Sequence, residues 1–84
     1  MEEQAVRIKG YAELVHDKIC YFKTDQGWML YLPKCGLGCL KLHEVKENPD
    51  GTISATPSIL VTGHDEGKPM QRHGYLTNGI WKEV

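Results

Sequence analysis

Two cysteines in a glycine-rich stretch are the residues of this sequence best suited to chemistry. Cys35 and Cys39 stand on either side of Gly36-Leu37-Gly38, so a tight turn there can point both sulfurs at one centre. Glycine tolerates the positive φ values that such a turn needs, and backbone amides freed by the turn can donate to thiolates. Zinc accepts two sulfur and two imidazole ligands in a tetrahedron. The stretch therefore predicts half of a structural zinc site; the alternative is two buried cysteines in a glycine loop.

The other two ligands must come from the four histidines. His64 and His73 bracket the polar stretch Gly63–Arg72, and metal ligation at both ends would keep a loop of that kind ordered. His43 is the alternative to His64. It follows Cys39 by four residues, about 13 Å along an extended strand, so it reaches the same ion only if the chain bends at Cys39. We predict one structural zinc ion with four ligands: Cys35, Cys39, His64 and His73.

The same residues disfavour catalysis. A closed four-ligand zinc leaves no position for substrate or water. Asp65 and Glu66 follow His64 and could serve as a base, but a solvated turn is the simpler interpretation. A nucleophilic Cys20 with His16 lacks a third group to orient the histidine, so Cys20 is expected in the core and His16 in solvent. The sequence indicates a protein that is not an enzyme, without catalytic or cofactor-binding residues.

Length, charge and cysteine count narrow the class of protein further. Eighty-four residues make one domain, and the formal net charge is −1 with Lys and Arg dispersed, which disfavours nucleic-acid binding. No apolar stretch is long enough to span a bilayer and no signal segment opens the chain, so a cytoplasmic location without membrane contact is expected. Three cysteines in a reducing compartment favour a metal over disulfides.

Turn signals between short apolar runs predict an all-β domain, a small antiparallel meander or curled sheet with a zinc-stabilised loop. The strongest turns are Asn48-Pro49-Asp50-Gly51 and Asn78-Gly79. Residues 1–10 are expected to be a flexible segment and residues 11–84 the domain. The expected strands are Ala12–Val15, Ile19–Lys23, Trp28–Leu32, Leu40–Lys46, Thr52–Thr56, Ser58–Thr62, Tyr75–Thr77 and Ile80–Val84.

Three further expectations concern the strands' surroundings. A turn at His16-Asp17-Lys18 should join the first two strands into a hairpin, Pro57 should end a strand, and Gly63–Arg72 should form one long polar loop. The run from Trp28 to Leu32 is apolar on both faces of a strand. Either the sheet curls on itself to bury both faces, or one face meets a partner.

Three motifs resemble a family of small bacterial and phage proteins, the domain of unknown function 6527. Cys35–Cys39 matches its cysteine–glycine metal loop, Asp50–Ser54 with Pro57-Ser58-Ile59 matches its middle segment, and His73–Leu76 with Gly79-Ile80-Trp81 matches its closing hairpin. The resemblance covers roughly residues 12–84. The sequence departs from the family pattern in two ways. Its two thiols are further apart than is usual, and its closing motif lacks the cysteine, for which His64 would substitute.

The resemblance implies a zinc-ribbon-like domain of bacterial or phage origin. Some members of the family are thought to be encoded near bacterial ubiquitin-like conjugation genes, which implies a non-catalytic interaction or accessory role. Surplus aromatic residues, among them Trp28 and Tyr75, independently favour a protein partner or self-association. The alternatives are a phage-encoded inhibitor of a host defence complex, a zinc-dependent hydrolase and a nucleic-acid-binding zinc ribbon.

Overall fold

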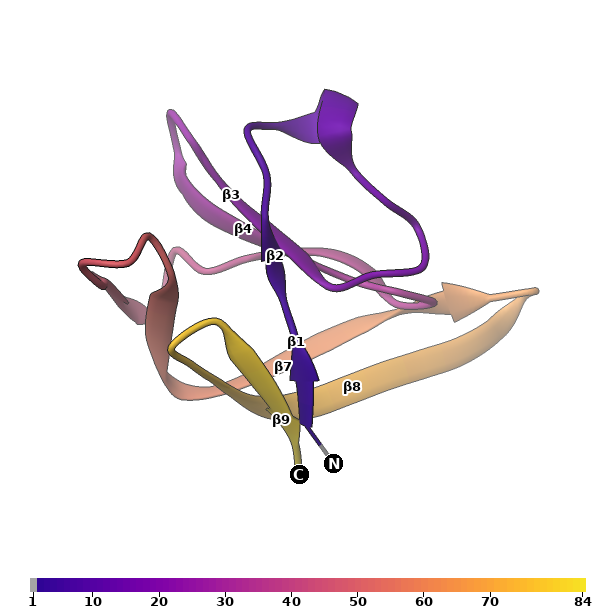
Figure 1. Ribbon diagram of the computed structural model, residues 1–84. Coiled ribbons are helices and arrows are strands. Elements are labelled where there is room, and N and C mark those ends of the chain that lie inside the picture. Colours follow the sequence, from indigo (N-terminus) through magenta and orange to yellow (C-terminus); the bar gives the residue numbers. More distant parts are fainter. Residues whose placement is uncertain (1) are drawn as a thin grey trace.

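The computed structural model describes residues 2–84 and confirms the all-β prediction. These residues form nine strands and one short 3-10 helix (Figure 1). The strands are β1 Glu2–Gln4, β2 Val6–Arg7, β3 Cys20–Thr24, β4 Gly27–Leu32, β5 Gly36–Cys39, β6 Glu44–Glu47, β7 Ile53–Asp65, β8 Lys68–Thr77 and β9 Ile80–Glu83, with helix η1 at Tyr11–Glu13. Within this range no helix is long and apolar enough to cross a membrane.

The strands build two sheets that the N-terminal segment connects. One sheet has five strands in the order β1-β9-β8-β7-β6, and the other has four in the order β2-β3-β4-β5. β1 pairs with β9 in the first sheet, and β2 then pairs with β3 in the second, so the chain runs from one sheet to the other through Ala5 (Figure 1). Residues 2–4 and 6–7 therefore form strands within the segment 1–10 that was expected to be flexible, of which residue 1 lies outside the described range. The β2–β3 pair is parallel in an otherwise antiparallel fold.

Both strong turn predictions are confirmed. Asn78 and Gly79 have φ of 52° and 74° and join Thr77 to its partner Ile80, the geometry of a two-residue hairpin turn with two left-handed residues. Gly51 has φ of 89° and closes the turn between β6 and β7. In that turn Asp50 accepts hydrogen bonds from the backbone and hydroxyl of Thr52, which lower the pKa of its carboxyl.

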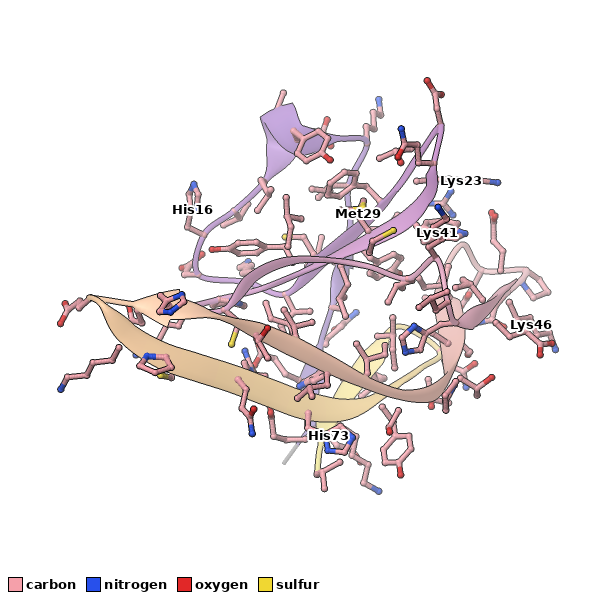
Figure 2. The ribbon with its side chains drawn as sticks, turned by 180° about the vertical axis from the view of Figure 1, so that it is seen from behind. His16, Lys23, Met29, Lys41, Lys46 and His73 are labelled. Carbon is pink, nitrogen blue, oxygen red and sulfur yellow. The ribbon has the colours of Figure 1, made fainter. Side chains whose placement is uncertain are left out.

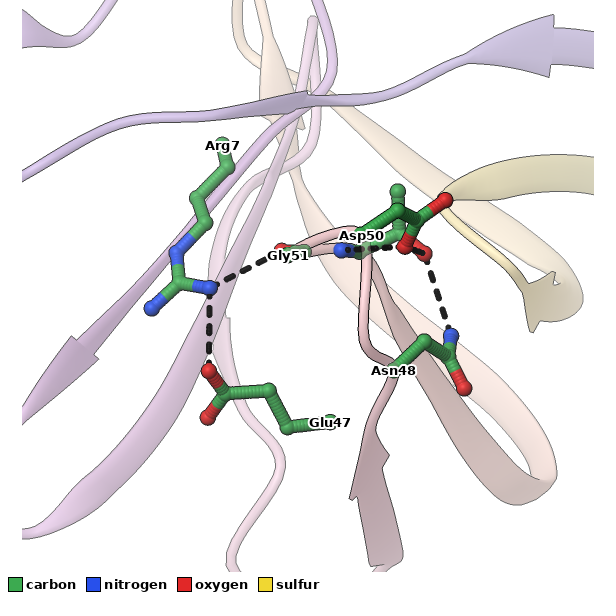
Figure 3. A network of polar contacts seen from close by, with 6 residues as sticks. Arg7, Glu47, Asn48, Asp50 and Gly51 are labelled. Atoms are coloured by element: carbon green, nitrogen blue, oxygen red, sulfur yellow. Dashed lines mark hydrogen bonds and ion pairs between the residues drawn. The ribbon is translucent and has the colours of Figure 1, made fainter.

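A single arginine ties this second turn to the N-terminal strand (Figure 3). The Nη1 atom of Arg7 donates to the Gly51 carbonyl at 2.9 Å and lies 3.2 Å from a carboxylate oxygen of Glu47. Its guanidinium also lies 5.1 Å from the centre of the Trp28 ring. Arg7 thus links β2 and β4 of the four-stranded sheet to the β6–β7 turn of the five-stranded sheet.

The main core fills the space between the sheets, and a smaller one lies outside the four-stranded sheet. Trp28, Leu30 and Leu32 point into the main core, whereas Met29 and Tyr31 pack into the smaller one. Residues before β3 cover this smaller core: Ile8 and Leu14 belong to it, and the Tyr11 ring packs edge-on against Phe22 at 4.8 Å. A loop of the same chain therefore covers the second apolar face of β4.

Several strand predictions are wrong in their boundaries. Residues 12–15 form no strand; they belong to helix η1 and the loop that covers the smaller core, so no hairpin turns at His16. The strand expected at Leu40–Lys46 begins only at Glu44, because the chain turns at residues 41–42. Pro57 does not end a strand. It follows a cis peptide bond inside β7, where the pairing with β8 is irregular between Ala55 and Ile59.

The largest difference concerns residues 63–72, which form no loop. β7 and β8 continue as a paired hairpin up to Asp65 and Lys68, and the turn is the two residues Glu66 and Gly67, with φ of 52° and 78°. The inner face of this hairpin lies against the β4–β5 turn at Gly63, where a Cβ atom would overlap the Cys35 carbonyl group. Polar residues or glycine on both faces of the hairpin made a strand look like a loop.

Candidate functional site

The two cysteines predicted to share a metal lie at opposite ends of an extended strand. Cys35 closes the turn between β4 and β5, where its N–H donates to the Leu32 carbonyl at 3.0 Å. Cys39 is the last residue of β5 and lies opposite Met29. At the rise of a strand, the four residues from Cys35 to Cys39 span about 13 Å. Glycines 36 and 38 therefore lie in a strand, where a metal-binding loop was expected.

The two predicted histidine ligands are also separated from each other and from Cys35. His64 lies opposite Pro69 and His73 opposite Leu60, four pairs apart in the β7–β8 ladder, or about 13 Å. Both histidines are exposed on the outer face of the hairpin, whereas Cys35 is buried against the inner face at Gly63. In Figure 2, His73 projects from the side of the ribbon that faces away from the four-stranded sheet.

Together these positions do not bring the four predicted ligands around one centre, and the zinc ion stays a prediction. Among residues 2–84 no three side chains of histidine, cysteine, aspartate or glutamate gather as metal ligands would. Burial also raises the pKa of the Cys35 thiol, an effect that Arg72 partly opposes, and a thiol binds zinc as the thiolate. This arrangement therefore supplies no geometric support for the predicted zinc site. The function proposed below does not depend on that site.

The structure instead brings two histidines to one serine. His43 lies with Nε2 3.2 Å from the Ser58 carbonyl oxygen, and His73 lies with Nε2 2.9 Å from the Ser58 hydroxyl. Because a carbonyl oxygen only accepts, His43 carries its hydrogen on Nε2, and its Nδ1 atom is buried without a partner among the described residues. These contacts hold the turn before β6 against β7 at the point where the β7–β8 pairing is irregular.

The Ser58–His73 pair does not amount to a catalytic site. A serine nucleophile needs a histidine base that a third group holds in place. In the part of the chain that is described, the hydrogen bonds of the His73 ring end at Ser58, and no carboxylate holds its second nitrogen. The other nucleophile candidate, Cys20, is fully buried with its sulfur 3.5 Å from the Lys18 carbonyl, while the His16 ring faces the Tyr31 hydroxyl at 3.3 Å.

An ion pair organises the inner side of β8 and β9. Arg72 donates to Glu83 at 2.7 Å, and the indole N–H of Trp81 donates to the same oxygen at 2.8 Å. The hydrogen bond from Arg72 is the main cause of the lowered pKa of the Glu83 carboxyl, with a smaller contribution from Trp81. The Arg72 guanidinium and the Glu83 carboxylate therefore neutralise each other, and the Trp81 indole donates a further hydrogen bond to the carboxylate. This is the pattern of a structural ion pair.

The surface that the sequence did not indicate is the outer face of the five-stranded sheet. Side chains alternate along each strand, so this face is built from every second residue of β1, β6, β7, β8 and β9. We define the outer face by the following residues: Glu2, Gln4, Glu44, Lys46, Ser54, Thr56, Ser58, Leu60, Thr62, His64, Pro69, Gln71, His73, Tyr75, Thr77, Ile80, Lys82 and Val84. Apolar alternation is present at Ile59 and Val61, but Gly63, Asp65, Lys68 and Arg72 break it on the inner face, so the sequence carried no clear signal for this surface.

Large apolar side chains are exposed on the outer face. Leu60 is 56%, Tyr75 50% and Val84 72% exposed. Leu60 lies opposite His73, and the N–H of Val84 donates to the His73 carbonyl, so these three residues form one row across β7, β8 and the end of the chain. Beside that row, Tyr75 and Lys82 line a shallow depression of about 390 Å3 together with Glu2, Thr77 and Ile80.

Comparison of the chain with protein-family models, with curated proteins and with solved structures finds no match. The fold and the site therefore define a class only: a two-sheet, all-β domain in which no residue of the described range 2–84 covers the outer face of the five-stranded sheet. The resemblance to the domain of unknown function 6527 stays a prediction.

The two cysteines provide a test that separates the observed arrangement from a zinc site. Cys39→Ser is expected to change the free energy of unfolding by less than about 0.5 kcal/mol, because Cys39 is exposed. Cys35→Ser is expected to lower it by about 1–3 kcal/mol, because the serine hydroxyl would be buried in an apolar site. Urea unfolding of both variants measures the difference.

Thiol labelling checks the same point without a mutation. In the native protein one thiol per chain, that of Cys39, should react quickly with a thiol reagent, whereas Cys20 and Cys35 are buried and should react slowly. A zinc site would behave differently. It would protect Cys39 until a chelator is added, and both serine variants would lose metal and stability together.

Proposed function

We propose that this chain is a non-catalytic protein-interaction domain that binds its partner through the outer face of the five-stranded sheet. The observation that carries the proposal is the contrast between the two sheets. Residues of the N-terminal segment cover the outside of the four-stranded sheet, whereas no described residue covers the outside of the five-stranded sheet. Two large apolar side chains in its strands, Leu60 and Tyr75, are half exposed or more.

The composition of the outer face supports binding to a protein. Its acidic and basic residues are Glu2, Glu44, Lys46 and Lys82, and all four lie on β1, β6 or β9. The central strands β7 and β8 carry no Asp, Glu, Lys or Arg on this face. Depletion of charged residues together with an exposed aromatic ring is typical of the centre of a protein–protein interface. The depression beside Tyr75 would accept one side chain of a partner. A face of this composition offers little attraction to a nucleic acid, whose affinity depends on positive charge.

Site-specific photo-crosslinking tests this proposal. A benzophenone amino acid placed at Tyr75 should form covalent adducts with a protein in the cells that produce this chain, because Tyr75 lies on the proposed surface. Placed at Tyr11, the same group should give several-fold less adduct. Tyr11 is equally exposed, at 58% against 50% for Tyr75, but it lies on η1, over the four-stranded sheet.

Equal labelling from both positions, or no protein adduct from Tyr75, would contradict the proposal. Circular dichroism of both substituted proteins verifies that they fold, since each tyrosine has its ring partly in solvent and neither belongs to the main core.

A further inference from the structure

The outer face is electrically self-complementary. It carries two acidic residues, Glu2 and Glu44, and two basic residues, Lys46 and Lys82. Glu2 and Lys82 lie opposite each other on β1 and β9, with Oε2 and Nζ 3.9 Å apart. Both side chains of the pair are exposed, so each charge stays accessible to a second molecule. The formal charge of the face is therefore zero, and two copies of it would meet without net repulsion.

The arrangement of Tyr75 and Lys82 adds a specific attraction between copies. These residues lie directly opposite each other on β8 and β9. Two copies can meet with their outer faces toward each other. A twofold axis then lies between them, parallel to the strands and above the gap between β8 and β9. This axis exchanges the positions of the two strands. Each Tyr75 ring then faces the Lys82 ammonium of the second copy, and an ammonium over an aromatic ring is attracted by it.

We propose that the occupant of the outer face is a second copy of this chain, which forms a symmetric face-to-face dimer around Tyr75 and Lys82. This inference rests on the proposed function and names its partner. Twofold dimers are the commonest form of association, and they use one patch twice, so the patch must complement itself. The row formed by Leu60, His73 and Val84 lies next to the axis and adds apolar contact on both sides of it.

Sedimentation equilibrium of the purified chain tests the dimer. The wild-type protein should pass from one to two chains per particle as its concentration rises. Tyr75→Ser and Lys82→Gln should each weaken the dimer by about 3-fold to 30-fold, because each removes one half of the ring–ammonium contact. Lys82→Arg should retain it. Tyr11→Ser is the matched control and should leave the association unchanged, since Tyr11 lies over the other sheet.

Two outcomes would overturn the dimer. One is a wild-type chain that stays monomeric at every concentration, and the other is a dimer that Tyr75→Ser and Lys82→Gln leave as tight as before. Both substitutions are at exposed positions, and circular dichroism confirms that the variants fold. If the chain is monomeric while Tyr75 still crosslinks to a different protein, the dimer is refuted and the proposed interaction function stands. If Tyr75 crosslinks to no protein, the interaction function fails as well.

Discussion

Replacing Trp81 with alanine is expected to lower the free energy of unfolding by about 3–5 kcal/mol, the largest effect of any single substitution considered for this protein. Trp81 is only 1% exposed and belongs to the main core between the sheets. Its ring lies where Gly74 leaves room, because a Cβ atom on Gly74 would come within 2.8 Å of it. The substitution therefore leaves a cavity and removes a hydrogen bond to Glu83.

The size of this loss matters because the domain is small. At about 0.05–0.15 kcal/mol per residue, a chain of 84 residues is stable by about 4–13 kcal/mol, so Trp81→Ala should remove about a quarter or more of its stability. Thermal and urea unfolding followed by circular dichroism measure the change. Lys68→Ala, at an exposed position of β8 outside the outer face, is the control and should change stability by less than about 0.5 kcal/mol. A similar loss in both variants would contradict the packing described for β9.

Gly63→Ala is expected to lower the free energy of unfolding by about 2–3 kcal/mol, although it adds a single methyl group. The added Cβ would overlap the carbonyl group of Cys35. That group is backbone, held by the Cys35 N–H bond to Leu32, and cannot move aside as a flexible side chain would. Either the β4–β5 turn or the β7–β8 hairpin must therefore move, and the contact between the two sheets is lost at this end.

Two controls separate this steric effect from a general cost of replacing glycine or a β7 residue. Gly10→Ala adds the same methyl group where nothing lies within 4 Å and where φ is 174°, an extended conformation that alanine adopts. Thr62→Ala changes the neighbouring exposed position of β7. Each should shift the midpoint of urea unfolding far less than Gly63→Ala. If Gly63→Ala leaves the midpoint unchanged, the hairpin does not lie against Cys35 as described.

What the sequence determined by itself about this protein is its local turn chemistry. Asn78-Gly79 and Asp50-Gly51 predicted their hairpins correctly because positive φ is a property of the turn residues themselves. The alternation of Trp28, Leu30 and Leu32 likewise predicted a strand, since the period of two is visible within five residues. These local signals were enough to predict the all-β class.

The tertiary structure decided everything that depends on which strand lies beside which. Residues 63–72 carry polar side chains or glycine on both faces of the β7–β8 hairpin, so this part of the hairpin could be recognised only from the pairing of its strands and from its contact with Cys35 at Gly63. For the same reason the glycines between Cys35 and Cys39 suggested a metal loop, while pairing with β4 extends them as a strand and carries the two thiols apart. Spacing along the chain limits which side chains can meet, but strand pairing between distant segments decides which of them do. Here it joined His73 to Ser58 and left Leu60 and Tyr75 on an uncovered face.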